Sequence, residues 1–331
     1  MWFEELTGFT EESSQQVRTN ITVEGKSLKS LVSEKVFVCG ELETPSLAEL
    51  RERIRSSEHK AGRISVREVV ANVQHLHADE SNAGSLFQVA SQFNLLEMVS
   101  PGVTPEHGVG IYENDRTQGP ACAIAAGAGT IYRNYFAIVN GQTGQSASNQ
   151  IDCLADIGEA LGNSGSRLWE MKNGYALATQ SGLVEIGRWL RSASEDELDN
   201  LRQLLRIGIQ WDTQVTLNDS GHLVSQVYCS ALPVAYSAHS SNLWAEFARL
   251  VLEAAYEATI CAAILNSVKN GDNRVFLTLL GGGAFGNQSD WIIGGLQRAL
   301  NLYRQFDLNV AIVSYGSSRP DIQNFIHQIQ V

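Results

Sequence analysis

An apolar run that stops at three consecutive glycines is the feature that most constrains how this chain can fold. Residues 275–280 read Val-Phe-Leu-Thr-Leu-Leu, and Gly-Gly-Gly-Ala-Phe-Gly-Asn follows directly at 281–287. An amphipathic stretch at helical spacing comes next, from Trp291 to Tyr303. A strand, a glycine turn and a helix N-terminus in this order predict a loop whose backbone N–H groups can converge on a phosphate. The glycines would equally suit a plain structural turn, but the aromatic Phe285 within the turn favours a loop that covers a nucleotide.

The charge balance and the cysteines narrow the class of protein. The 331 residues carry 24 Lys and Arg against 36 Asp and Glu, a formal net charge of −12, so a broad nucleic-acid surface is not expected. Such a protein suits a cationic partner, for example an arginine-bearing surface. The five scattered cysteines predict reduced thiols, with neither a zinc site nor a disulfide framework. No apolar run reaches the roughly 18 residues of a membrane span, and the acidic start does not read as a signal peptide. We therefore expect a cytoplasmic protein that does not enter a membrane.

Helix and strand patterns alternate along the chain. A capping box opens a helix at Ser46, and a second helix is expected over Ser65–His77, where four valines recur at helical spacing. Residues 210–229 read as a β-hairpin around an Asn-Asp-Ser-Gly turn. A long helix is expected from Ser241 to about Asn266.

This alternation predicts an α/β fold of three layers, in which a mixed, largely parallel sheet carries helices on both faces. Neither an internal repeat nor a Pro-, Ser- or charge-rich linker divides the chain. We therefore expect a single domain over residues 36–331. Residues 1–35 are polar and mixed, and we interpret them as an N-terminal arm or cap.

A second candidate loop follows the strand that is predicted at residues 85–94. From Leu95 to Gly119 the sequence has few periodic apolar positions, and ordered loops of this length are usually functional. Pro120 then opens a helix rich in Ala and Gly. Ligands of open α/β sheets bind beyond the carboxyl ends of the strands. The two loops should therefore meet at one edge of the sheet if their strands are parallel neighbours.

This arrangement resembles the two ligand loops of macrodomains, which bind ADP-ribose. Val89 and Asn94 match the Val-Asn-Ala-Ala-Asn strand end of that family, and Ala284-Phe285-Gly286 resembles its Gly-hydrophobic-aromatic-Gly diphosphate loop. A carboxylate-rich segment stands where the family usually has a Gly-Gly-Gly-Val loop. In this respect the chain resembles a divergent branch, the macrodomain-like ADP-ribosyl-arginine hydrolases first seen among bacterial effectors. The similarity covers roughly residues 85–136 and 274–315.

The resemblance implies a macrodomain-like hydrolase that removes ADP-ribose from a modified protein side chain, with arginine as the expected linkage. Cleavage of that N-glycosidic bond, by analogy with O-glycosidases, calls for one or two positioned carboxylates. Asp115 is the first choice because it stands just before a helix start, followed by Glu97 and then Glu106. Each could instead be a solvated loop carboxylate, and Asp115 could be a helix cap. The resemblance also implies an inserted region at about residues 140–270.

The glycine loop would hold the diphosphate through its backbone N–H groups, and Asn94 with Gln92 would fix a ribose. Asn94 could instead make only an Asx turn, and Tyr315 could stack on adenine or simply end a strand. No metal and no cofactor are expected, and ADP-ribose is the ligand and product. The full set of residues expected to contact it is Gln92, Phe93, Asn94, Gln118, Gly281, Gly282, Gly283, Ala284, Phe285, Gly286, Asn287 and Tyr315.

Two other functions stay open at the level of sequence. A non-catalytic ADP-ribose reader would share the glycine loop but would need no carboxylates. A different α/β nucleotide-binding enzyme is the third reading, although the glycine run lacks the Gly-x-Gly-x-x-Gly spacing of dinucleotide sites. In the hydrolase reading the partner is an ADP-ribosylated protein, in the cytoplasm or, for a secreted effector, in the cytosol of a host.

Overall fold

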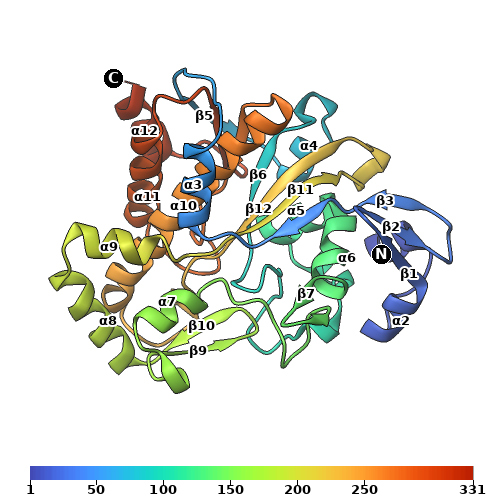
Figure 1. Cartoon of the computed structure of the whole chain (residues 1–331), viewed down its shortest axis with the longest axis horizontal. Coiled ribbons are helices and arrows are strands. Elements are labelled where there is room, and N and C mark those ends of the chain that lie inside the picture. The colour runs from blue at the N-terminus through green and yellow to red at the C-terminus, as the bar shows by residue number, and fades with distance from the viewer. Residues whose placement is uncertain (331) are drawn as a thin grey trace.

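The computed structural model describes residues 1–330, and a seven-stranded sheet lies at its centre (Figure 1). β11 pairs antiparallel with both of its neighbours, whereas every other neighbouring pair in the sheet is parallel. This confirms the predicted mixed, largely parallel sheet. In spatial order its strands are β4 (Glu41–Glu43), β11 (Gly208–Gln214), β12 (Leu223–Cys229), β6 (Leu86–Ala90), β13 (Arg274–Leu277), β14 (Asn309–Ser314) and β5 (Ser65–Val70).

Helices cover both faces of this sheet, as the alternation of patterns predicts (Figure 1). The helices on one side are α10 (Ser241–Asn270) and α11 (Ser289–Leu302), with α3 (Leu47–Arg55) and α12 (Pro320–Gln330) beside them. The helices on the other side are α4 (Val73–Ala78), α5 (Gln118–Ala125) and α6 (Gly127–Tyr135).

Glycines let these helices approach closely. A Cβ on Gly129 of α6 would lie 2.8 Å from Thr213 Oγ1 of β11, and one on Gly295 of α11 would lie 3.1 Å from the Tyr256 ring of α10. The Ala- and Gly-rich helix expected after Pro120 is thus two short helices that pack tightly on the sheet.

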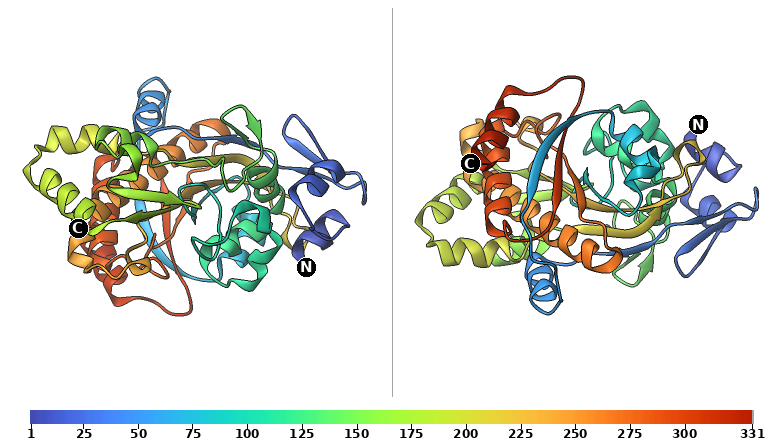
Figure 2. Two further views of the ribbon diagram at one scale, coloured as in Figure 1. Left: turned by 90° about the horizontal axis from the view of Figure 1, so that it is seen from below. Right: turned by 90° about the horizontal axis from the view of Figure 1, so that it is seen from above.

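Two smaller units lie at opposite ends of the molecule's long axis (Figures 1 and 2). The N-terminal one consists of α1 (Trp2–Thr7), α2 (Ser14–Asn20) and a sheet of β1 (Ile21–Glu24), β2 (Ser27–Ser30) and β3 (Val36–Val38). It has an apolar core of its own, which includes Phe3, Val17 and Leu28. The other contains β9 (Trp169–Lys172), β10 (Tyr175–Ala178), α7 (Ala155–Ala160), α8 (Gln180–Ser192) and α9 (Glu195–Arg202), and the short strands β7 (Ile138–Val139) and β8 (Gln142–Thr143) precede it.

These units bear on how the stretch 140–270, expected as an inserted region, is organised. Residues 208–270 supply β11, β12 and α10 to the central body, whereas residues 140–207 lie outside the central sheet.

None of the helices in residues 1–330 combines the length and the apolar character that a membrane crossing requires.

The helix predicted over Ser65–His77 is wrong. Residues 65–70 form the edge strand β5, paired in parallel with β14, and only residues 73–78 are helical. β-branched side chains favour a strand, and within β5 Val66 alone is fully buried. The valine spacing that resembled a helix therefore does not mark one continuous apolar face.

Other local predictions are confirmed. Ser46 and Glu49 form the capping box of α3, with the Ser46 N–H donating to Glu49 Oε2 over 2.7 Å. The predicted hairpin is the β11–β12 pair, and the expected long helix is α10, which continues to Asn270. The strand before the glycine loop and the helix after it are β13 and α11.

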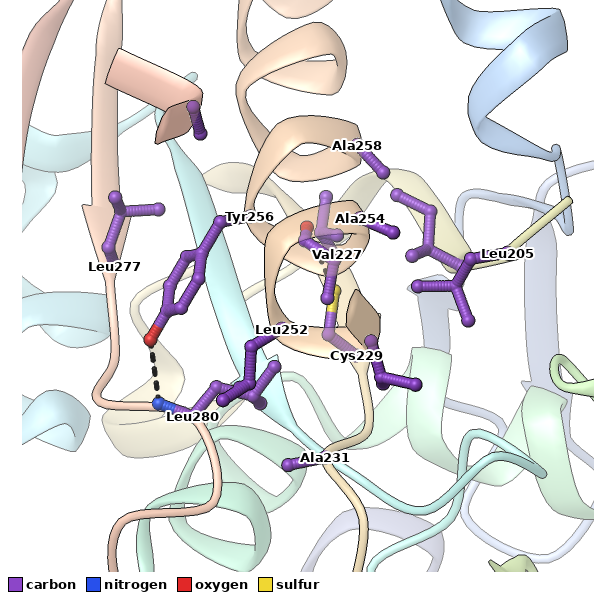
Figure 3. Close-up of a cluster of buried hydrophobic side chains, with 14 of the residues drawn as sticks. Leu205, Val227, Cys229, Ala231, Leu252, Ala254, Tyr256, Ala258, Leu277 and Leu280 are labelled. Carbon is purple, nitrogen blue, oxygen red and sulfur yellow. Dashed lines mark hydrogen bonds between the residues drawn. The ribbon is translucent and has the colours of Figure 1, made fainter. Parts of the chain in front are cut away.

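The buried core between α10 and the sheet also fixes the start of the glycine loop (Figure 3). Leu252 and Ala254 of α10 lie among apolar side chains of β12 and β13, such as Val227 and Leu277. In their midst, the Tyr256 hydroxyl donates to the Thr278 carbonyl oxygen over 2.8 Å and accepts from the Leu280 N–H over 2.9 Å. One buried phenol of α10 therefore holds the chain where it leaves β13.

We predict that Tyr256→Phe destabilises the protein by about 1–3 kcal/mol, because a buried carbonyl and amide lose their partner. The free energy of unfolding in urea is the measurement. The control is Tyr132→Phe, since the hydroxyl of the half-buried Tyr132 makes no hydrogen bond within residues 1–330, and it should change stability by less than about 0.5 kcal/mol. Equal effects of the two substitutions would contradict the role given to Tyr256.

Candidate functional site

The two predicted loops meet at one edge of the sheet. β6 lies between β12 and β13 and is parallel to both, so the segments that follow these three strands leave the sheet at the same edge. Between them is a hollow of about 710 Å³, counting the part that is open to solvent. Asp115 and Gly281 both line it, so the long loop and the glycine loop face a common space.

The residues that line this hollow, the main cavity, come from five segments of the chain. The predicted site residues among them are Gln92, Glu97, Asp115, Gln118, Gly281, Gly283, Ala284 and Phe285. The others are Ala90, Ser91, Met98, Val99, Thr117, Gly119, Pro120, Tyr175, Ala231, Tyr236, Thr278, Leu279 and Leu280.

Three residues of the glycine loop that line the main cavity have backbone donors without a partner in the described chain. Within residues 1–330 no group accepts a hydrogen bond from the N–H of Gly283, Ala284 or Phe285. Gly281 has φ +72°, and a Cβ there would lie 2.4 Å from Ala231 Cβ, so only glycine fits. The loop therefore offers three successive amide donors on a tightly fixed turn, a geometry suited to an anion.

Three residues of the glycine loop that were expected to contact the ligand lie beside the main cavity and not in its lining. Gly282, Gly286 and Asn287 do not line the main cavity. Gly286 has φ +72° and packs on Ala235, while Asn287 Nδ2 donates to the Leu232 carbonyl oxygen over 2.8 Å. These contacts join the glycine loop to the segment after β12.

An aromatic wall encloses the main cavity on one side. Phe285 of the glycine loop, Tyr175 of β10 and Tyr236 after β12 have ring centroids 5.0–5.5 Å apart. The Ala235 N–H donates to the Phe285 carbonyl oxygen over 3.0 Å. Two of these rings were not predicted, because nothing local in the sequence shows that a separate hairpin brings Tyr175 to this edge.

Asp115 is half-buried and has one oxygen available. Its Oδ1 accepts from the Thr117 N–H over 2.9 Å, which is an Asx turn just before α5. The N-cap residue of α5 is Thr117, so Asp115 does not take the helix-capping role that was its alternative reading. Its Oδ2 accepts no hydrogen bond within residues 1–330. Burial raises the pKa of Tyr175, with smaller contributions from Tyr236 and then from the charge of Asp115. The Asx turn therefore holds one carboxylate oxygen of Asp115 and leaves the other available.

Glu97 also lines the main cavity, but its side chain is fully buried and paired. Arg133 Nη2 lies 3.0 and 3.1 Å from its two carboxylate oxygens, and both side chains are 0% exposed. Burial raises the pKa of Glu97, and the charge of Arg133 offsets only part of that effect. The Arg133 guanidinium lies 3.6 Å from the centroid of the Tyr228 ring, which sandwiches it between a carboxylate and an aromatic face.

The side chains of Gln92 and Gln118 make hydrogen bonds to backbone groups around the main cavity. Gln92 Oε1 accepts from the Met98 N–H over 2.8 Å, which braces the turn that carries Glu97. Gln118 Oε1 accepts from the Ala90 N–H, and its Nε2 donates to the Gln88 carbonyl oxygen, each over 2.8 Å. Their amide groups are thus engaged by the protein, although both residues line the cavity.

Four further predicted residues lie outside the main cavity. Asn94 is buried, and its Oδ1 accepts from the Leu96 N–H over 3.1 Å, so it makes the Asx turn that was its alternative reading. Phe93 is 2% exposed in the core. Glu106 is exposed, and its Oε1 accepts from the Ala147 N–H over 2.8 Å. Tyr315 is 82% exposed beyond β14. The structure therefore does not bring these four residues together with those that line the main cavity.

The Glu11 carboxylate of the N-terminal unit accepts hydrogen bonds from the backbone of the long loop. Glu11 Oε1 accepts from the Val109 N–H over 3.0 Å, and its Oε2 accepts from the Gly110 N–H over 2.6 Å. The Tyr135 hydroxyl donates to the same carboxylate over 2.5 Å. Sequence reasoning missed this contact because Glu11 stands in a polar segment about 100 positions before its partners.

Cationic side chains are absent from the main cavity. Within residues 1–330, no Lys, Arg or His lines it, and no group of three or more His, Cys, Asp or Glu side chains is placed to hold a metal ion. An anion bound here would depend on backbone amides, and a cationic group would meet the carboxylates without competition.

Comparison with known proteins finds distant similarity only. No protein-family model and no curated protein matches the chain. Poly(ADP-ribose) glycohydrolase from Deinococcus radiodurans in complex with ADP-ribose aligns with a TM-score of 0.46 and 12% identity, over 88% of this chain and 94% of that one. The Thermomonospora curvata enzyme gives a TM-score of 0.46 and 10% identity, over 96% of each chain. Similarity at this level assigns neither a family nor a ligand, so we judge the site on its own residues.

We predict that Arg133→Met destabilises the protein by about 3–5 kcal/mol at pH 8, because it leaves the Glu97 carboxylate buried without a partner. The loss should be smaller at pH 5. A buried Glu whose folded pKa is raised takes up a proton on folding, so its stability penalty grows as pH rises from the ordinary glutamate range towards the raised value. Removing Arg133 raises that value further.

Urea unfolding of the Arg133→Met protein at pH 5 and pH 8 checks this. Arg133→Met combined with Glu97→Gln should recover much of the loss at pH 8, because no unpaired charge is buried. Arg188→Met removes an exposed arginine and should have little effect at either pH. A penalty for Arg133→Met that is independent of pH would count against the charge explanation.

Proposed function

We propose that this chain is a hydrolase that removes ADP-ribose from a modified protein side chain by cleaving the N-glycosidic bond of ADP-ribosyl-arginine. The observation that carries the proposal is the lining of the main cavity. Within residues 1–330, three residues of the glycine loop with unpaired backbone amides and Asp115 with its unpaired oxygen line this common space. Free amides suit a diphosphate, and a carboxylate suits the reacting end of a ribose.

In this proposal the amides of Gly283, Ala284 and Phe285 bind the diphosphate. The rings of Phe285, Tyr175 and Tyr236 supply an apolar surface against which the sugar and nucleoside lie. No lysine or arginine is needed, which agrees with the lining of the main cavity within residues 1–330.

The reaction itself would proceed at Asp115. The bond between the ribose anomeric carbon and the guanidine nitrogen breaks with its electron pair going to nitrogen, and a water oxygen bonds to the carbon. Asp115 Oδ2 orients this water and accepts its proton, which then passes to the departing guanidine. Glu97 contributes negative charge beside the oxocarbenium-like centre, held in place by Arg133.

Arginine is the favoured linkage because, within residues 1–330, the main cavity is lined by carboxylate residues and by no cationic side chain. An arginine substrate brings a positive guanidinium to Asp115, which is a favourable contact. An ester linkage to Asp or Glu would leave a carboxylate product facing two carboxylates.

A non-catalytic ADP-ribose reader is the second candidate. The observation that favours it is the pairing of Glu97 with Arg133, which leaves Asp115 as the one main-cavity carboxylate with an unoccupied oxygen within residues 1–330. ADP-ribose binding without turnover would decide for this alternative.

We predict that Asp115→Asn lowers the rate of ADP-ribose release from an arginine-ADP-ribosylated protein by about 10²–10⁴-fold, the usual contribution of a positioned general base. Its affinity for free ADP-ribose, measured by calorimetry, should stay within about threefold. The matched control is Glu113→Gln, the same change at an exposed residue of the same loop that does not line the main cavity. Wild-type turnover by Asp115→Asn would end the catalytic claim.

We also predict that Gly281→Ala weakens ADP-ribose binding at least tenfold, because a Cβ at φ +72° strains the backbone and collides with Ala231. Gly294→Ala is the control, since a Cβ at this exposed position on α11 meets nothing within 4 Å. Calorimetry on both variants checks the prediction, and equal affinities would argue against the glycine loop as the diphosphate site.

A further inference from the structure

A second, smaller hollow adjoins the main cavity at its acidic end. It comprises about 400 Å³ of empty space, counting the part open to solvent. Its lining consists of Glu97, Val99, Ile111, Tyr112, Asn114 and Asp115. Glu97, Val99 and Asp115 line the main cavity as well, so the two hollows share one boundary. We call this second hollow the side cavity.

The walls of the side cavity combine apolar surface with unused polar atoms. Val99 is 56% exposed, and Ile111 is half-buried. Ile111 and Asn114 are three residues apart in the short 3₁₀ helix Gly110–Asn114, where such residues lie on the same side. The Asn114 amide makes no side-chain hydrogen bond within residues 1–330, and Asp115 Oδ2 is free as well.

The charge of the side cavity is of one sign. Asp115 contributes a carboxylate without an ion-pair partner, Glu97 is buried in its pair with Arg133, and none of the Lys, Arg and His residues in positions 1–330 lines the side cavity. An apolar stem that ends in a planar cation matches this lining, because the stem can lie on Val99 and Ile111 while the cation meets Asp115. A phosphate or a carboxylate does not match it.

We propose that the side cavity is the subsite for the arginine side chain from which ADP-ribose is removed. The three methylene groups lie between Val99 and Ile111, and the guanidine group lies against the Asn114 amide and Asp115. This inference rests on the proposed function. It adds Val99, Ile111 and Asn114 as residues that determine the choice of substrate, none of which the diphosphate or the ribose requires.

The geometry gives the boundary between the two cavities a definite role. With ADP-ribose in the main cavity and arginine in the side cavity, the bond to be broken spans the residues common to both. Asp115 is one of these, so the residue with the free carboxylate oxygen stands where the sugar ends and the side chain begins.

The experiment fills the side cavity and leaves the main cavity unchanged. Ile111→Trp should lower kcat/KM for an arginine-ADP-ribosylated peptide at least tenfold, while the Kd for free ADP-ribose stays within twofold of wild type. Ile138→Trp is the matched control, since Ile138 is 66% exposed and lines neither cavity. It should leave both values within twofold. Wild-type kcat/KM in an Ile111→Trp protein that binds ADP-ribose would overturn the inference.

A second variant covers the case in which Ile111→Trp does not fold, which loss of ADP-ribose binding would reveal. Asn114→Ala removes one exposed amide and should raise KM for the peptide severalfold with little change in the Kd for ADP-ribose. An unchanged KM would then overturn the inference. If the wild-type protein releases no ADP-ribose from the peptide, the proposed function itself fails and takes the subsite with it. If the wild-type protein is active and both variants release ADP-ribose as the wild type does, the subsite inference fails and the proposed function stands.

Discussion

The site depends on a sheet that stops pairing early. β6 and β13 are matched at two residue pairs, the second of which stacks the rings of Phe87 and Phe276 4.5 Å apart. Beyond that point glutamine side chains replace the missing strand contacts. Gln88 Oε1 accepts from the Thr278 N–H over 3.2 Å, and the Gln118 amide spans two backbone groups of β6. Because the two strands separate while their hydrogen-bonding groups remain satisfied, a gap can open at the carboxyl edge without the cost of unpaired buried amides. The main cavity lies at this opening.

The two acidic residues that line the main cavity are held by different interactions, an ion pair for Glu97 and a backbone hydrogen bond for Asp115. Glu97 is fully buried, so its charge is tolerable only beside Arg133, and its position is fixed by that pair. Asp115 is held by a single amide, that of Thr117, and keeps contact with solvent. A rigid, screened carboxyl group and an accessible one therefore stand side by side. Such a division between a fixed charge and an adaptable one is what enzymes use when one group must stabilise charge and another must move a proton.

Sequence patterns predicted what is local and periodic. The strand, glycine turn and helix around residues 275–302 and the capping box of Ser46 depend on neighbouring residues, so their chemistry is visible in the chain. The edge strand β5 was misread because spaced valines are compatible with both a helix and a partly exposed strand. The aromatic wall could not be predicted, because Tyr175 reaches the site through a hairpin outside the main sheet. The pairing of Arg133 with Glu97 was equally hidden, since helix α6 returns it to the loop from 36 positions away.

The Glu11 carboxylate has a consequence for how far this fold can be reduced. It accepts two hydrogen bonds from the long loop and one from Tyr135 of α6, and a Cβ on Gly108 or Gly110 would collide with it. Through Glu11, the first dozen residues thus stabilise a loop that lies about 100 positions further along the chain. A fragment trimmed to the α/β body would leave the Val109 and Gly110 amides and the Tyr135 phenol without their shared acceptor. The smallest unit that preserves this chemistry therefore includes the N-terminal residues that the sequence suggested were an arm or a cap.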